Sequence, residues 1–287
     1  MRGKLISFVL MAGLVAGVAA AQVPTRITVD RTGMYCSGTI TTDAVPQDSY
    51  IISGEQSVDK VAFVVGQLVY INRGSAQGVK VGDEFQVVRH VQEELKEVWF
   101  RGQNELMRAM GETWADLGRV KVVHVGDKVS TAEVTATCDY IQRGDIVLPF
   151  TERPAPPLKQ DSAVVDPFVP ATGKTGMIVS SKYFGQASGT NSIVYVNLGA
   201  SQGVRVGSYL RVFRNQGRGV STIYQNKGTE YKLYGFGSTP VEYTWEGLPR
   251  EILGEGIVVR VSGNTATLMI TAVRREIYAG DYVELEQ

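Results

Sequence analysis

The sequence predicts a mainly all-β protein made of two tandem small β-barrel or sandwich modules, with a short helical insertion in the first module. Three observations support this prediction. A long segment of the chain occurs twice, glycine is abundant at 32 of 287 residues, and Val, Ile, Thr and Tyr recur in short runs. This composition is typical of many short strands joined by tight turns. A chain of this length accommodates two domains of ordinary size.

The N-terminus has the pattern of a secretory signal peptide over residues 1–21. Arg2 and Lys4 form a basic start, residues 5–18 are apolar, and small residues at 19–21 form the cleavage site. The alternative is an uncleaved anchor, but the apolar stretch is shorter than the ~20 residues of a membrane span. We therefore expect a periplasmic or extracellular protein with no membrane span once the leader is removed.

An internal repeat dominates the rest of the chain. Residues 69–89 read VYINRGSAQGVKVGDEFQVVR and residues 194–214 read VYVNLGASQGVRVGSYLRVFR, with eleven of 21 positions identical. Downstream, residues 117–148 resemble residues 253–285. Similarity of two long blocks in the same order indicates one structural unit that was copied.

The repeat also sets the expected domain boundaries. Upstream of the repeated block, TGMYCS (32–37) resembles TGMIVS (175–180), which extends the alignment toward the N-terminus. A Pro-rich segment separates the two copies, and such segments form extended spacers. The expected modules are residues 26–150 and 173–287, with the linker at 151–172.

Each module is predicted to contain five or six strands. In the first module, residues 67–72 alternate polar and apolar side chains, and spaced glycines then indicate bends before an apolar run ending at Val88. Gly-Asp pairs mark further turns. Closure into a barrel would remove exposed strand edges. The later strands of the first module are expected at 120–125, 132–137 and 145–148.

A segment that differs between the copies interrupts this pattern. Residues 91–112 are rich in Glu, Leu, Met and Arg with apolar residues at helical spacing, whereas residues 215–243 are rich in Gly and Tyr and hairpin-like. Loops that vary on a constant scaffold commonly carry function. We therefore expect any difference in binding between the modules here.

The chain has two cysteines, Cys36 and Cys138. In an exported protein an even pair indicates a disulfide, while the alternative is two small buried apolar residues. We expect the bridge to join the first and last strands of the first module, stabilising it by ~2–4 kcal/mol.

Aromatic residues provide the candidate binding surface. Trp114 and Trp245 each follow a threonine, and an exposed Trp could stack on a sugar ring, although a shared core anchor explains the pair equally. A Tyr-rich stretch of the second module fits a recognition surface, with cross-strand aromatic pairing as the alternative. Its members are Tyr224, Tyr231, Tyr234 and Tyr243.

The sequence does not predict a catalytic residue, a metal site or a cofactor. His90 and His124 stand in no metal-binding spacing, and no nucleophile motif occurs. An exported enzyme would need scattered acids such as Asp127, Glu133 and Asp145 to converge. Arg143-Gly144-Asp145 spells an adhesion tripeptide, but its counterpart in the second module keeps only the turn.

The charge balance argues against nucleic acid as a partner. The formal net charge is zero, and removal of the leader leaves the mature chain slightly acidic. Neutralising phosphates requires an excess of Lys and Arg.

Blocks 69–89 and 194–214 resemble the C-terminal domain of flagellar assembly protein T and related β-modules. Residues 248–285 resemble the C-terminal region of envelope proteins that carry a LysM peptidoglycan-binding module, although this chain has no LysM module of its own. The resemblance implies a barrel-like envelope module.

Together these features predict a non-catalytic exported envelope protein with a binding or scaffolding role, whose partner is peptidoglycan or an envelope protein assembly. One alternative is a subunit of a secretion, flagellar or filament machine. The other is an exported enzyme whose site the sequence does not group.

Overall fold

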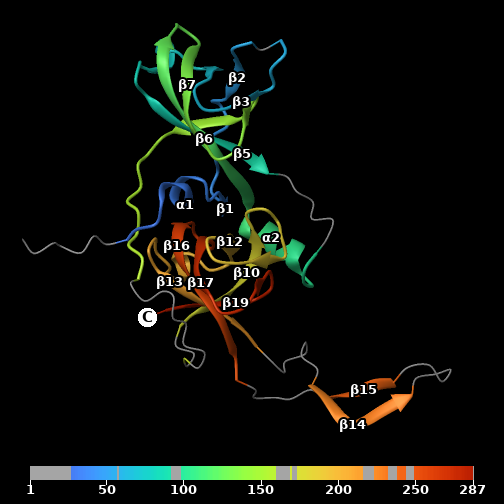
Figure 1. Ribbon diagram of the computed structural model, residues 1–287. Helices are drawn as coiled ribbons and strands as arrows, with labels where there is room; N and C mark the ends of the chain where they lie inside the picture. The colour runs from blue at the N-terminus through green and yellow to red at the C-terminus, as the bar shows by residue number, and fades with distance from the viewer. Residues whose placement is uncertain are drawn as a thin grey trace, which may run out of the picture.

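The computed structural model describes residues 27–56, 58–91, 98–159, 169, 173–215, 223–231, 238–243 and 249–286. These residues form two antiparallel β-barrels with few helical turns, so the mainly all-β prediction is confirmed. Figure 1 shows one barrel above the other, with helices between them. The predicted signal peptide at 1–21 lies outside the described residues.

Barrel one is formed by β2 (Ile51–Gly54), β4 (Leu68–Ile71), β5 (Glu84–Val91), β6 (Glu112–Val125), β7 (Ser130–Thr137) and β9 (Ile146–Pro149). The strand order is β2-β4-β7-β6-β5-β9. The two outer strands meet through a bridge between Tyr50 and Ile146 and through the bond from Ile51 N to Asp145 O, 2.9 Å. The sheet is therefore curled into a barrel.

Barrel two is formed by β10 (Thr175–Ser181), β12 (Ile193–Val196), β13 (Tyr209–Arg214), β16 (Glu251–Val261), β17 (Ala266–Val273) and β19 (Tyr282–Leu285). It is closed in the order β10-β12-β17-β16-β13-β19. This order repeats barrel one strand for strand. The closing bond recurs as Ile178 N to Asp281 O, 2.8 Å.

A two-stranded pair lies beside each barrel and is also duplicated. In barrel one β3 (Ala62–Phe63) pairs with β8 (Ile141–Gln142), and in barrel two β11 (Ala187–Ser188) pairs with β18 (Ile277–Tyr278). The pair in barrel one places Phe63 and Ile141 in the core of its barrel, and the pair in barrel two places Ile277 there.

Glycines of the repeated block allow close contact between loops. A Cβ atom on Gly74 would lie 2.4 Å from Gly126 O, and a Cβ on Gly199 would lie 2.4 Å from Thr265 N. No larger residue fits at either position, which explains why the motif keeps glycine in both copies. The 3-10 helices after these glycines are η1 (Ser75–Gln77) and η2 (Ala200–Gln202).

The alignment of residues 32–37 with residues 175–180 is wrong. Residues 175–181 form β10, whose counterpart in barrel one is β2, whereas α1 (Arg31–Tyr35) is a helix outside either barrel. Asp30 caps this helix by accepting a hydrogen bond from Gly33 N, 2.8 Å. The four shared letters reflect composition and not equivalent structure.

Residues 27–41, which we call the N-terminal arm, lie between the barrels. The arm contains α1 and β1 (Thr39–Thr41), and β1 pairs with the first residues of β6. Apolar side chains of the arm cover the outside of barrel two. This contact cluster contains Val29 and Met34 of the arm and Tyr209, Ile257, Val259 and Met269 of the barrel.

The helical insertion also contacts barrel two. It is shorter than predicted: β5 extends to Val91, α2 covers Gln103–Met110, and residues 92–97 lie outside the described residues. Met110 packs with Tyr195 on the outside of barrel two. No helix in the described part of the chain has the length and apolar character needed to cross a membrane.

The first part of the Pro-rich linker runs beside the arm. Val29 N donates to Pro156 O at 3.0 Å, and Leu158 N donates to Ile27 O at 2.8 Å. The segment is extended, as predicted, but these bonds hold it against the arm, and Figure 1 shows it descending along one side of the molecule.

The Tyr-rich segment of the second module forms a hairpin of β14 (Ile223–Tyr231) and β15 (Ser238–Tyr243). Tyr224, Tyr231 and Tyr243 lie on these strands, and Tyr234 lies outside the described residues. Their role as a recognition surface stays a prediction.

Candidate functional site

The structure contains the predicted Cys36–Cys138 disulfide. Cys36 ends α1, and Cys138 follows β7, where its N–H donates to Leu117 O at 2.8 Å. We expected the bridge to join the first and last strands of module one, and this expectation is wrong. The bridge ties the N-terminal arm to barrel one at the junction with barrel two.

Hydrogen bonds attach the arm to the wall of barrel two. The Tyr195 hydroxyl donates to Ser37 O at 3.0 Å, and Thr267 Oγ1 donates to Gly38 O at 3.2 Å. Burial raises the pKa of Tyr195, so its hydroxyl stays protonated and remains a donor. Two carbonyl groups of the arm thus accept hydrogen bonds from barrel two, although the arm precedes barrel one in the sequence.

A buried carboxylate joins three parts of the molecule. Asp116 of β6 is 2% exposed and accepts hydrogen bonds from Gly38 N at 2.8 Å and from Gln86. Arg260 of barrel two donates from Nη1 to its Oδ1 at 3.2 Å. A buried charge needs such partners, so Asp116 links barrel one, the arm and barrel two.

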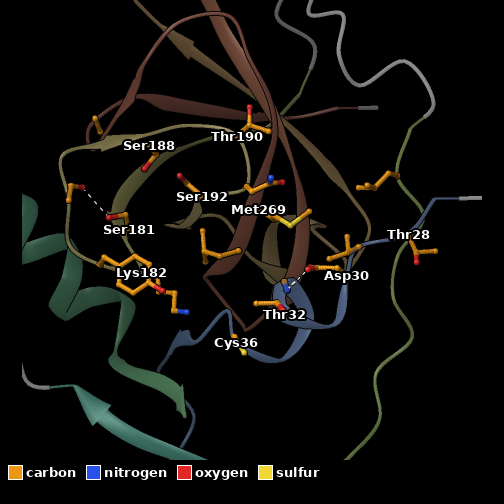
Figure 2. Close-up of a pocket in the computed structure, with 18 residues that line it drawn as sticks. Thr28, Asp30, Thr32, Cys36, Ser181, Lys182, Ser188, Thr190, Ser192 and Met269 are labelled. Carbon is orange, nitrogen blue, oxygen red and sulfur yellow. Dashed lines mark hydrogen bonds between the residues drawn. The ribbon is translucent and has the colours of Figure 1, made fainter. Parts of the chain in front are cut away.

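A cleft of about 570 Å³ opens between the arm and barrel two; we call it the arm cleft. Figure 2 shows Asp30, Thr32 and Cys36 on its lower side and Ser188, Thr190 and Ser192 on its upper side. Met269 lies between the two sides and is 7% exposed. The cleft requires the arm to be docked, because barrel two forms only one of its walls.

The upper side of the arm cleft is a tight turn with fixed geometry. Asn191 has a left-handed backbone, φ 67°, and its N–H donates to Ile270 O at 2.8 Å. Ser192 Oγ accepts from Gly189 N at 3.0 Å. The hydrogen bonds of the turn therefore do not use the side chains of Thr190 and Asn191, which are exposed.

A second cavity of about 490 Å³ lies between barrel one and residues 182–184 of barrel two. Lys182 and Tyr183 line both this cavity and the arm cleft. Trp99 Nε1 donates to Phe184 O at 3.2 Å, so a residue near α2 holds this loop in place.

A buried ion pair closes each barrel at the Gly-Asp turn. Arg89 donates to Asp145 through Nε at 2.7 Å and Nη2 at 2.9 Å, and Arg214 donates to Asp281 at 2.7 and 2.8 Å in the same way. The bonded Asp raises the pKa of Arg89, and that of Arg214 likewise. Since Asp145 is 2% exposed, residues 143–145 act as a structural turn and not as an adhesion motif.

Trp114 is not a surface residue. It is 2% exposed on β6, and its ring packs against His90 with centroids 5.2 Å apart. The register of β6 and β16 places Arg250, and not Trp245, at the equivalent position, because Gly118 and Gly254 occupy the same place in each barrel. Trp245 lies outside the described residues.

Reactive side chains do not gather among the described residues. No group of three or more His, Cys, Asp or Glu that could hold a metal ion occurs in this part of the chain. Asp145 is bound to Arg89, and His124 is exposed on β6. What these residues do form is two open clefts beside the arm, with both polar and apolar side chains in their lining.

The sequence analysis did not identify Tyr183 and Asn191, which line the arm cleft. Their loop differs from the corresponding loop of barrel one, residues 55–67, and this difference within a repeat was the available signal. The arm residues on the other side of the cleft gave no such signal, because they come close to barrel two only when the arm docks on it.

Comparison with known families gives one match. The family model for the flagellar assembly protein T, C-terminal domain matches residues 66–149, less than a third of the 287-residue chain. The matched segment runs from just before β4 to the end of β9, which is most of barrel one. The predicted resemblance is confirmed there, while the resemblance of residues 248–285 to LysM-containing proteins has no support. No curated protein matches the chain.

Proposed function

We propose that this protein is an exported, non-catalytic subunit of an envelope assembly of the flagellar or secretion kind. The match of barrel one to the C-terminal domain of flagellar assembly protein T carries the proposal. The rest of the chain supports it, because barrel two copies the same fold. In this role the protein holds partners at a fixed separation.

The disulfide supports an oxidising compartment. Disulfides persist in exported proteins and are rare in the cytosol. Cys36 and Cys138 are both only partly buried, so a reducing environment would attack the bond. This agrees with the signal-peptide pattern at residues 1–21.

The rigid connection between the barrels supports a scaffolding role. The arm, α2 and the linker all contact barrel two, and Asp116 pairs with Arg260 across the junction. A subunit that sets the spacing of an assembly needs this kind of rigidity.

Barrel one offers the better docking surface. Its exposed apolar side chains include Val58 at 95%, Val61 at 74% and Val81 at 66%. The barrel-two counterpart of Val81 is Val206, which is 44% exposed. Clustered exposed apolar residues commonly mark protein interaction sites.

Photocrosslinking in intact cells tests the proposal. A photoreactive residue is placed at Val81, and a matched control carries it at Val206. We expect Val81 adducts to contain proteins of an envelope machine and to be more abundant than Val206 adducts. Adducts with unrelated proteins only, or equal yields at both positions, would contradict the proposal.

Peptidoglycan is the second candidate partner, because the arm cleft is open and presents side-chain hydroxyl groups beside apolar surface. Co-sedimentation of the purified chain with isolated sacculi distinguishes attachment to peptidoglycan from docking on a protein assembly. Sedimentation without any protein adduct from Val81 would favour peptidoglycan attachment.

A further inference from the structure

We propose that the arm cleft binds a neutral saccharide segment of two or three sugar units. This site is separate from the proposed protein-docking surface on barrel one, and the inference does not depend on that function. The cleft volume, about 570 Å³, lies within the usual range of small-ligand sites, roughly 300–1,000 Å³.

The charge of the lining favours an uncharged ligand. Among the described residues that line the cleft, Asp30 is the one acidic residue and Lys182 the one basic residue. Opposite single charges do not favour a phosphate or a polycation, either of which needs an excess of one sign. The remaining polar groups are mostly hydroxyls and one amide.

These polar groups are available to a ligand. The side chains of Thr28, Thr32, Thr190 and Asn191 make no hydrogen bond to another described residue. All four are exposed and line the cleft. Thr32 and Thr190 lie on its opposite sides (Figure 2). A carboxamide offers donors and an acceptor together, which matches neighbouring hydroxyls of a sugar.

The cleft also offers apolar surface for the C–H face of a sugar ring. Tyr183 is 81% exposed, and although the Lys182 ammonium group lies 4.9 Å from the centre of its ring, most of the ring remains open to a ligand. Its loop is held by the bond from Trp99 to Phe184 O, so little conformational freedom is lost on binding. Met269 and Ile193 add apolar atoms between the two sides.

Barrel two provides one wall of this site, and the docked arm provides the other. The arm also lines a smaller cavity of about 220 Å³ against barrel one, together with Gln86, Arg119 and Phe150, but that cavity contains neither Tyr183 nor Asn191. The two barrels therefore present different side chains to the arm despite their shared fold.

Titration of the purified, disulfide-bonded chain with three trisaccharides tests the proposal by calorimetry or NMR. Chitotriose represents an N-acetylated glycan strand, cellotriose has the same linkage without acetamido groups, and maltotriose has a different linkage. We expect millimolar or tighter binding of at least one, and preference for chitotriose would indicate peptidoglycan as the source.

Variants identify the site. Tyr183→Ala should weaken binding about tenfold or more, and Asn191→Gly, which tolerates the left-handed backbone, should weaken it severalfold. Tyr50→Ala changes a tyrosine on barrel one that is 41% exposed and should leave binding unchanged. Thermal unfolding confirms that each variant is folded.

Two results would overturn the proposal. One is the absence of binding for all three trisaccharides at about 10 mM, a concentration that detects even weak sites. The other is binding that Tyr183→Ala and Asn191→Gly leave intact. Neither result affects the crosslinking test at Val81, so failure of this inference and failure of the proposed function are distinguishable.

Discussion

Asp145 and Asp281 explain why each repeat ends in a Gly-Asp turn. Each carboxylate accepts two hydrogen bonds from an arginine on the neighbouring strand and a third from a backbone N–H of its own turn. The glycine before each Asp has positive φ, 87° at Gly144 and 100° at Gly280. Turn and ion pair together fasten the last strand of each barrel.

Asp145→Asn and Asp281→Asn should each destabilise the protein by about 2 kcal/mol, because the substitution leaves an arginine without its charged partner. Urea unfolding measures the loss. Asp127→Asn, in an exposed turn of barrel one, is the control and should change stability by less than about 0.5 kcal/mol. Equal effects at Asp127 and Asp145 would mean that the ion pair does not stabilise the barrel.

Glu255 is a buried carboxylate whose burial is incompletely compensated. Its Oε1 has no hydrogen-bond partner, although Lys159 Nζ lies 3.5 Å from Oε2. Burial raises the pKa of Glu255 above its ordinary value, and the attraction of Lys159 only partly opposes this shift.

Stability should therefore fall as pH rises from the ordinary pKa of a Glu through the raised pKa of Glu255. In that window the folded protein binds more protons than the unfolded chain, so the free energy of unfolding decreases with pH. Glu255→Gln should flatten this decrease and raise the melting temperature at pH 7. The exposed Glu133→Gln should preserve the wild-type profile, and an unchanged profile in Glu255→Gln would show that another group is responsible.

At the scale of elements, the fit of α1 against barrel two depends on a glycine. A Cβ atom on Gly33 would lie 2.9 Å from Val29 Cγ1 and 3.0 Å from Met269 Sδ. A side chain at this position would therefore press against Val29 and Met269, and the absence of one allows the helix to lie close to the barrel. This contact forms one wall of the arm cleft.

Gly33→Val should displace the arm and cost about 1–3 kcal/mol, the usual penalty for overpacking. Hydrogen exchange of the amides at residues 29–36 should accelerate, while exchange in barrel one should stay the same. Gly263→Val, where a Cβ meets no atom within 4 Å, is the matched control. Unchanged exchange in Gly33→Val would show that the arm docks without this close contact.

At the scale of the whole molecule, the disulfide connects the docked arm to barrel one across 102 residues of sequence. Cross-linking a loop of this size stabilises a protein by about 4–5 kcal/mol in the chain-entropy description. Because the arm also covers barrel two, the bond couples the unfolding of both barrels.

The double variant Cys36→Ser, Cys138→Ser should lose up to about 4 kcal/mol and should unfold in two separable steps, where the oxidised protein unfolds in one. Calorimetry with and without reductant measures both effects. Reduction of the wild-type protein should reproduce the behaviour of the variant. A single transition in all samples would show that the Asp116–Arg260 pair and the apolar contacts couple the barrels without the disulfide.

The repeated fold was predictable from local sequence, because strand alternation and turn glycines act over a few residues. Gly74 and Gly199 illustrate this: each position requires glycine for a contact within its own barrel, so the requirement appears twice in the chain. The helical insertion and the hairpin were predicted for the same reason, although the limits of α2 were not.

The position of the arm depends on contacts between distant segments, which no local pattern records. Residues 32–37 resemble a strand of the repeat by letter, yet Asp30 caps a helix there and Met34 is buried against a barrel that begins more than 140 residues later, at Thr175. Trp114 was equally ambiguous, since burial is a property of the folded chain. The sequence alone sufficed for the two barrels; their attachment and the cleft between arm and barrel two arise only on docking, because they depend on which apolar surfaces cover one another.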